Sequence, residues 1–180
     1  MIDNLLGVYL IHLSYFALVF IPVISSLGFP FSEELVLLGA GYLAAIGFIR
    51  WDLGLMLVFI GVIAGDNSAY FIGRQGGRLF DLIVSERKLK KAQKYTDKHG
   101  AKAVFIARFI PGMRWLVPII TGASKMNYKK FFLYNTLGAI LVVPIGMSIG
   151  YYVGRSMEQI IVFTQDLNAI IFIFALVLIS

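Results

Sequence analysis

Two arginines bracket a helix-breaking Pro-Gly pair in the segment Arg108-Phe-Ile-Pro-Gly-Met-Arg114, and the residues around this segment are almost all apolar. A charged side chain near the centre of a bilayer costs roughly 2.5 to 3.5 kcal/mol even on the lenient insertion scale, so such residues usually face a partner or a wet cavity. A guanidinium keeps its proton and offers a planar fork of N–H donors to phosphate oxygens. Arg108 and Arg114, on either side of the break at Pro111 and Gly112, are therefore candidates to bind a phosphate; the alternative is that they pair with nearby carboxylates and hold the fold together.

Three carboxylates lie in similarly apolar surroundings. Glu33 and Glu34 follow a stretch broken by Gly28 and Pro30, and Asp66 lies inside a long apolar run. Burial disfavours the charged form of a carboxylate, and a nearby arginine favours it. An anion that binds the arginines would therefore shift the balance between the charged and the protonated form. These acids are therefore predicted to carry protons, with the choice between Glu33 and Glu34 left open.

Three further polar residues are predicted to support this site. Tyr70 stands four residues after Asp66 and shares its helix face. Arg74 follows one turn later, and Asn135 lies inside another apolar run.

The composition indicates an integral membrane protein with a single all-α domain over residues 1–180. Of the 180 residues, 59% are hydrophobic and only 14% are charged, which a water-soluble domain of this size could not bury. Apolar runs over 6–24, 53–73, 131–153 and 160–179 are each long enough for a helix that crosses a core of about 30 Å. About four transmembrane helices are therefore expected, and the first should be retained because the N-terminus lacks the features of a cleaved signal.

Two other apolar segments, 35–49 and 101–125, are too short or too broken to cross alone. Irregular backbone at membrane depth is tolerated where protein or water surrounds it. Both segments are therefore expected to form re-entrant helical hairpins, which enter the membrane and leave on the same side.

The basic residues are concentrated in one loop. Residues 74–102 contain nine Lys or Arg and three Asp or Glu, which accounts for the whole net charge of +6. A basic loop between spans is the positive-inside signature, so this loop and the N-terminus are expected in the cytoplasm, and the charge does not call for nucleic acid. Within the loop, 75–100 is expected to form an amphipathic linker on the inner leaflet.

The two halves of the chain have the same plan, a charged and broken short segment paired with a span that holds a polar residue. We expect a first repeat over about 6–74 and a second over about 101–180, inverted relative to each other. Inverted repeats whose broken helices meet at the midplane are a transporter design.

The combination of motifs resembles the DedA family, the bacterial members of the VTT or SNARE-associated superfamily. The motifs that carry the resemblance lie between about residues 25 and 155: Pro30-Phe-Ser-Glu-Glu34 with Gly41, Gly65-Asp66 with Tyr70, Gly73 and Arg74, Arg108 to Arg114 with Gly122 and Met126, and Phe131 with Asn135 and Gly138. The chain departs from the family pattern in having Ser32-Glu33 where Pro-Gly is usual, and Val142 where a tryptophan is common.

The resemblance implies re-entrant hairpins, inverted repeats and movement of a lipid across the cell membrane. Undecaprenyl phosphate is the first expected substrate, with proton coupling, and a flippase or scramblase for phosphatidylethanolamine or other phospholipids is the alternative. The resemblance also implies that the functional acids and arginines of the family correspond to Glu34, Asp66, Arg108 and Arg114. A homo-oligomer is a possible assembly.

Two other classes of function are weighed against lipid transport. A membrane phosphatase or serine protease would need histidine near the site, and the two histidines, His12 and His99, lie outside both broken segments. We therefore expect no enzyme activity, no metal and no other cofactor, and the lack of cysteine excludes disulfides and thiolate zinc sites. A proton-coupled carrier of ions or small solutes could use the same acids but has little need of two arginines.

Overall fold

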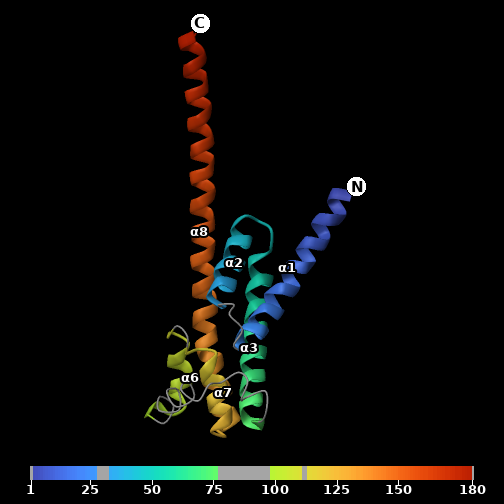
Figure 1. Ribbon diagram of the computed structural model, residues 1–180, viewed down its shortest axis with the longest axis vertical. Helices are drawn as coiled ribbons and strands as arrows, with labels where there is room; N and C mark the ends of the chain where they lie inside the picture. Colours follow the sequence, from blue (N-terminus) through green and yellow to red (C-terminus); the bar gives the residue numbers. More distant parts are fainter. Residues whose placement is uncertain (1, 28–32, 77–97, 111–112, 180) are drawn as a thin grey trace.

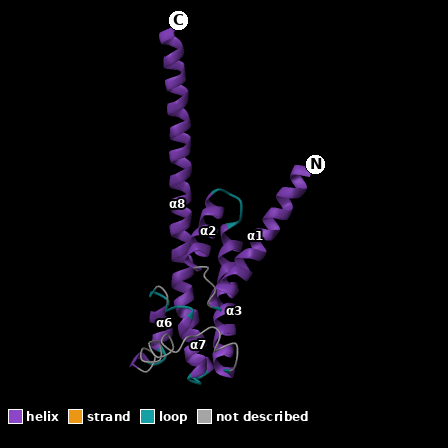
Figure 2. Cartoon of the chain, viewed as in Figure 1, coloured by secondary structure: helices purple, strands orange, loops and turns teal. Residues whose placement is uncertain are grey.

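The computed structural model describes residues 2–27, 33–76, 98–110 and 113–179, with residues 2–8 and 157–179 described as backbone. The described residues form helices joined by turns and contain no strand, which confirms the all-α prediction (Figure 2). The helices are α1 (Ile2–Ser26), α2 (Glu33–Ala45), α3 (Trp51–Gln75), α6 (Lys102–Ala107), α7 (Leu116–Ala123) and α8 (Tyr128–Ile179). The amphipathic linker predicted over 75–100 lies mostly outside the described residues.

Three helices are long and apolar enough to cross a membrane within the described residues, where four were expected. Their candidate spans are Tyr9–Ser26, Trp51–Gln75 and Tyr128–Ser156. The expected fourth span, 160–179, is not a separate helix, because α8 continues without interruption to Ile179. The sequence after Ser156 contains neither glycine nor proline, so nothing in its local chemistry ends the helix there.

α1 and α3 run in the same direction and pack on each other, and α2 runs the opposite way and packs on α8 (Figure 1). The Tyr15 hydroxyl accepts a hydrogen bond of 3.0 Å from the Arg50 backbone N–H, just before α3 begins, whereas Ser26 at the end of α1 lies beside Asp66. The end of α1 therefore lies beside the interior of α3.

This arrangement bears on the predicted position of the N-terminus. The beginning of α1 lies towards the end of the molecule that holds the turn between α2 and α3, and Arg74 lies at the opposite end of α3 (Figure 1). The N-terminus and the basic loop were expected on one side of the membrane. In the described residues the start of α1 and the end of α3 lie at opposite ends, and the side of the membrane on which each lies remains a prediction.

The second half of the chain repeats these packing relations. α1 packs on α3 and α6 packs on α8, while α2 packs on α8 and α7 packs on α3. α2 lies beside the upper part of α3 and α7 beside its lower part (Figure 1). The short helix of each half thus packs on the long helix of the other half, α2 on α8 and α7 on α3. Two inverted repeats would produce this arrangement, and the repeats and the re-entrant hairpins remain predictions.

Glycines allow the backbone of α2 to contact that of α8, and the backbone of α7 to contact that of α3. A Cβ atom on Gly41 of α2 would collide with the Met147 carbonyl oxygen of α8, and one on Gly122 of α7 would collide with the Tyr70 carbonyl oxygen of α3. The partner helices contribute Gly150 and Gly73 to the same two crossings. Close backbone approach through small residues is how helices associate in lipid, where apolar side chains gain little from leaving the membrane.

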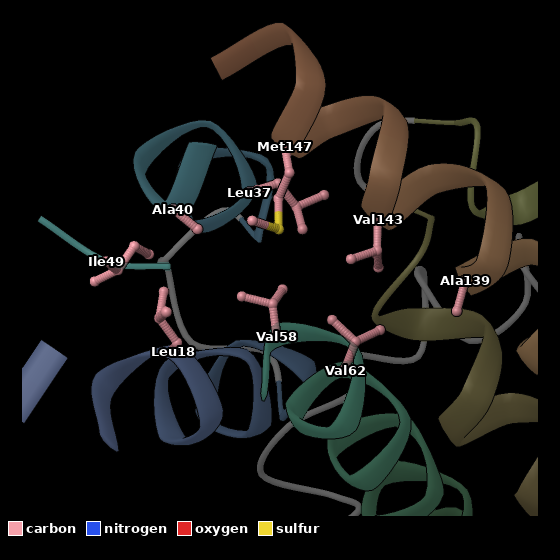
Figure 3. Close-up of a cluster of buried hydrophobic side chains, with 9 residues drawn as sticks. All are labelled: Leu18, Leu37, Ala40, Ile49, Val58, Val62, Ala139, Val143 and Met147. Carbon is pink, nitrogen blue, oxygen red and sulfur yellow. The ribbon is translucent and has the colours of Figure 1, made fainter. Parts of the chain in front are cut away.

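One apolar cluster joins the long helices and α2. Figure 3 shows its side chains converging from α1, α2, α3, α8 and the turn after α2. Its members are Leu18, Leu37, Ala40, Ile49, Val58, Val62, Ala139, Val143 and Met147. This cluster fixes α2 against α8 and thereby positions the charged residue with which α2 begins.

Candidate functional site

Arg108 and Asp66 form a buried ion pair between the two halves of the chain. Arg108 follows the last residue of α6, and its Nη2 contacts Oδ2 of Asp66 on α3. Their side chains are 2% and 3% exposed. The same Nη2 donates a 2.9 Å hydrogen bond to Oδ1 of Asn135 on α8. Asp66 and Asn135, both predicted to matter, therefore meet at one guanidinium.

Ser26 is a member of this group that the sequence analysis did not identify. Its hydroxyl lies 3.3 Å from Oδ1 of Asp66 and 3.0 Å from the carbonyl oxygen of Pro22. The neighbouring Ser25 is also buried, and its Oγ has no hydrogen-bond partner among the described residues. The signal available in the sequence was a pair of hydroxyls directly between the first apolar run and the first break.

Arg114 and Glu33 form a second ion pair, between the segment before α7 and the start of α2. Nη1 of Arg114 contacts Oε1 of Glu33, and the two side chains are 10% and 1% exposed. Glu34, the next residue, points outward and is exposed. Among the described residues, the structure thus brings Glu33, and not Glu34, into contact with an arginine.

The two ion pairs belong to one cluster, because Asp66 and Arg108 interact electrostatically with Glu33 across the boundary between the pairs. We call Glu33, Asp66, Arg108 and Arg114 the charge cluster. Two guanidiniums and two carboxylates balance in formal charge, which offsets part of the cost of burying each charge. Three segments far apart in sequence, the start of α2, the interior of α3 and the segment that carries Arg108 and Arg114, therefore meet at one buried polar centre.

Several N–H donors of this centre are buried without an acceptor. Within the described residues, Nε and Nη1 of Arg108 and Nδ2 of Asn135 have no hydrogen-bond partner. An unpaired buried donor costs about 1 to 3 kcal/mol, and more when it carries charge. Unused donors on adjacent side chains are the groups that an anionic oxygen would satisfy.

Tyr70 and Arg74 lie further along α3 and hold the beginning of α8. Tyr70 is fully buried and donates its hydroxyl proton to the carbonyl oxygen of Met126, while Nη1 of Arg74 donates to the Tyr70 hydroxyl at 2.7 Å. The Tyr70 ring also stacks on Phe131 of α8. Both predicted supporting residues therefore secure a helix junction rather than contact the charge cluster. Pro111 and Gly112 lie outside the described residues.

Comparisons with known proteins find membrane proteins of one family. The VTT domain family matches residues 29–152. The chain is 33% identical over 164 residues to an uncharacterized membrane protein of Synechocystis, covering 86% of this chain and 74% of that protein. It is 35% identical over 122 residues to Protein DedA of Escherichia coli K12, covering 64% of this chain and 56% of DedA.

A third relative has a name that states a substrate. The chain is 31% identical over 128 residues to undecaprenyl phosphate transporter A of Bacillus subtilis, covering 66% of this chain and 65% of that protein. No solved structure matches the chain. The match to the domain covers more than half of the chain and includes all four members of the charge cluster, and the chain therefore belongs to the VTT domain family, the membrane proteins that include DedA.

Proposed function

We propose that this protein moves a lipid with an anionic headgroup across the cytoplasmic membrane, with undecaprenyl phosphate as the first candidate and protons as the coupling ion. The observation that carries the proposal is the charge cluster with its unused donors on Arg108 and Asn135. The name of the Bacillus relative supports the choice of lipid.

A phosphate would enter the cluster by replacing a carboxylate as the partner of an arginine. Arg108 can keep one N–H on Asp66 while its free Nε and Nη1 bind phosphate oxygens, because a guanidinium has five donors. Arg114 provides a second fork from the neighbouring segment. Two arginines on adjacent segments match a phosphate monoester, which presents three charged or polar oxygens.

Proton coupling follows from the same exchange. A phosphate brings negative charge to a cluster that is balanced without it. When an arginine turns to the phosphate, its former carboxylate partner is left buried, and burial favours the neutral, protonated form. Binding would therefore take up a proton on Glu33 or Asp66, and release of the lipid would return it.

The position of the cluster suits transport between the two leaflets. It lies where α1 ends, where α2 and α7 begin, and where α2 and α7 extend towards opposite ends of α3 (Figure 1). Polar sites at the junction of broken helices are how carriers hold a substrate midway through the membrane. Movement of either short pair of helices would open the cluster to one side.

The direct test compares lipid translocation by Arg114→Lys with that of the native chain in proteoliposomes. Lysine keeps the charge opposite Glu33 and removes the planar fork, so we expect transport to fall by about tenfold or more while the thermal unfolding temperature stays close to native. Arg50→Lys is the matched control, because Arg50 is exposed and pairs only with Asp52 among the described residues. Native transport by a stable Arg114→Lys protein would exclude phosphate binding by this arginine.

The choice of lipid needs separate arms in the same assay. Undecaprenyl phosphate should be moved in preference to phosphatidylethanolamine, whose amine has no partner in a cluster already balanced in charge. Equal transport of both would favour the general flippase or scramblase. Transport of a soluble solute without any lipid movement would favour the carrier of ions or small solutes.

A further inference from the structure

An open apolar groove runs between α1 and α2 and has a volume of about 300 Å³. Its walls include Ala17, Leu18 and Ile21 of α1 and Val36, Gly39 and Ala40 of α2. Leu18 and Ala40 also belong to the core cluster of Figure 3, so the core forms the floor of the groove. The walls are almost entirely hydrocarbon, and the hydroxyl of Ser14 at one end is already donated to the Leu10 carbonyl oxygen at 2.9 Å.

One end of the groove lies beside the charge cluster. Val36 is one helical turn from Glu33, and Ile21 is about one turn from Ser25. From there the groove follows α2 as far as Leu43, away from the charges. A molecule with a charged end and a hydrocarbon chain could therefore place its charged end at the charge cluster and its chain in the groove.

Gly39 leaves room in this groove that the described part of the protein does not use. A Cβ atom at Gly39 would meet nothing within 4 Å, whereas one at Gly41 would collide with the backbone of α8. A glycine inside a helix is unfavourable by about 0.5 to 1 kcal/mol relative to alanine, so it usually has a reason. The close contact with α8 explains the glycine at position 41. It does not explain the glycine at position 39.

We propose that the groove holds the first units of the prenyl chain of a polyprenyl phosphate whose phosphate lies at Arg108 and Arg114. This inference rests on the proposed function and adds a site for the chain of the lipid. A hydrocarbon chain is the occupant that such walls can accept, because they offer no free hydrogen-bonding group. The methyl branches of a prenyl chain make it wider than a linear acyl chain, which accounts for the small residues Ala17, Gly39 and Ala40 in the walls.

The test fills the groove from each wall with Ala17→Phe and Gly39→Phe and measures binding to the purified protein in detergent. We expect the Kd for undecaprenyl phosphate to rise about tenfold in each variant, while inhibition by inorganic phosphate stays at the native level. Ala64→Phe is the matched control, because Ala64 is exposed on α3 outside the groove. It should bind both probes as the native chain does.

A second measurement keeps the proposal testable if the phenylalanine variants unfold. Undecaprenyl phosphate with a photoreactive group in its first prenyl unit should crosslink the native chain on α1 between Ser14 and Ile21 or on α2 between Leu35 and Leu43. Crosslinks confined to other helices would overturn the assignment of the lipid chain to the groove, as would native affinity in a folded Ala17→Phe protein.

Equal loss of dioleoyl phosphatidic acid binding in the phenylalanine variants would overturn the prenyl assignment, since the groove would then take linear acyl chains. If the native chain does not bind undecaprenyl phosphate at all, the proposed function fails. If it binds and Ala17→Phe leaves the Kd unchanged, only the groove proposal fails.

Discussion

At the scale of single residues, the structure separates two adjacent acids that sequence reasoning could not. Glu33 is 1% exposed and contacts Arg114, whereas Glu34 is exposed at the same helix start. The chain has Ser32-Glu33 where its family usually has Pro-Gly, so the buried contact is made by a residue that the family pattern did not indicate. The neighbours of a side chain in the folded chain decide its role here, more than its position in a motif.

Glu33→Gln and Glu34→Gln should therefore differ sharply. Removing the charge of Glu33 leaves Arg114 buried without its partner, and we expect a loss of about 3 to 5 kcal/mol in the free energy of unfolding together with loss of transport. Glu34→Gln should change the free energy of unfolding by less than about 0.5 kcal/mol. Thermal unfolding and transport measured on both proteins check this, and a larger effect at Glu34 would contradict the assigned pairing.

The Asp66 and Arg108 pair should behave as a unit. Asp66→Asn alone leaves a buried guanidinium without a counter-charge and should lower the free energy of unfolding by about 3 to 5 kcal/mol. Adding Arg108→Gln removes that uncompensated charge, so the double variant should be more stable than Asp66→Asn. A double-mutant cycle by chemical denaturation measures the coupling. Simple additivity of the two changes would show that the contact contributes nothing to stability.

At the scale of elements, the short helices are held by backbone contacts at glycines. Gly41 and Gly39 lie two residues apart on α2 and differ in their surroundings, since only Gly41 lies against the backbone of α8. A methyl group at Gly41 must push α2 away from α8, and with it the buried end of α2 at Glu33.

Gly41→Ala and Gly39→Ala therefore make a matched pair. We expect Gly41→Ala to lower the free energy of unfolding by about 1 to 3 kcal/mol through overpacking. Gly39→Ala should raise it by about 0.5 to 1 kcal/mol, because alanine favours the helix and meets nothing. Thermal unfolding in one detergent measures both. Equal destabilisation by the two substitutions would mean that α2 does not pack on α8 through Gly41.

The sequence predicted the elements better than their partners. Composition, the lengths of the apolar runs and the breaks near Pro30 and Pro111 are local properties, and they were enough to predict an all-α membrane protein with interior polar residues. The pairing of Arg108 with Asp66, the pairing of Arg114 with Glu33 and the contribution of Ser26 depend on which helices lie side by side. No local pattern specifies that, and for the same reason the hydrogen bond from Tyr70 to the Met126 carbonyl oxygen could not be predicted.

At the scale of the whole molecule, the direction of α1 determines how the chain lies in the membrane. α1 and α3 are parallel, so the start of α1 and the turn before α3 lie at one end and Arg74 at the other (Figure 1). The positive-inside rule places the end with the basic loop in the cytoplasm. We therefore propose that the beginning of α1 faces the opposite side, as an alternative to the cytoplasmic N-terminus expected from the sequence.

Single cysteines can test this orientation without background labelling, because the chain has no cysteine of its own. We expect Asn4→Cys and Arg50→Cys to react with a membrane-impermeant thiol reagent applied to intact cells, and Gln75→Cys to react only after the membrane is opened. Asn4 and Arg50 lie at the starts of two parallel helices, while Gln75 ends the second of them, beside the basic loop. Labelling of Asn4→Cys together with Gln75→Cys would mean that α1 crosses the membrane completely. The end of α1 would then lie away from the middle of the membrane, and the contact between Ser26 and Asp66 could not form at the depth where α2 and α7 begin.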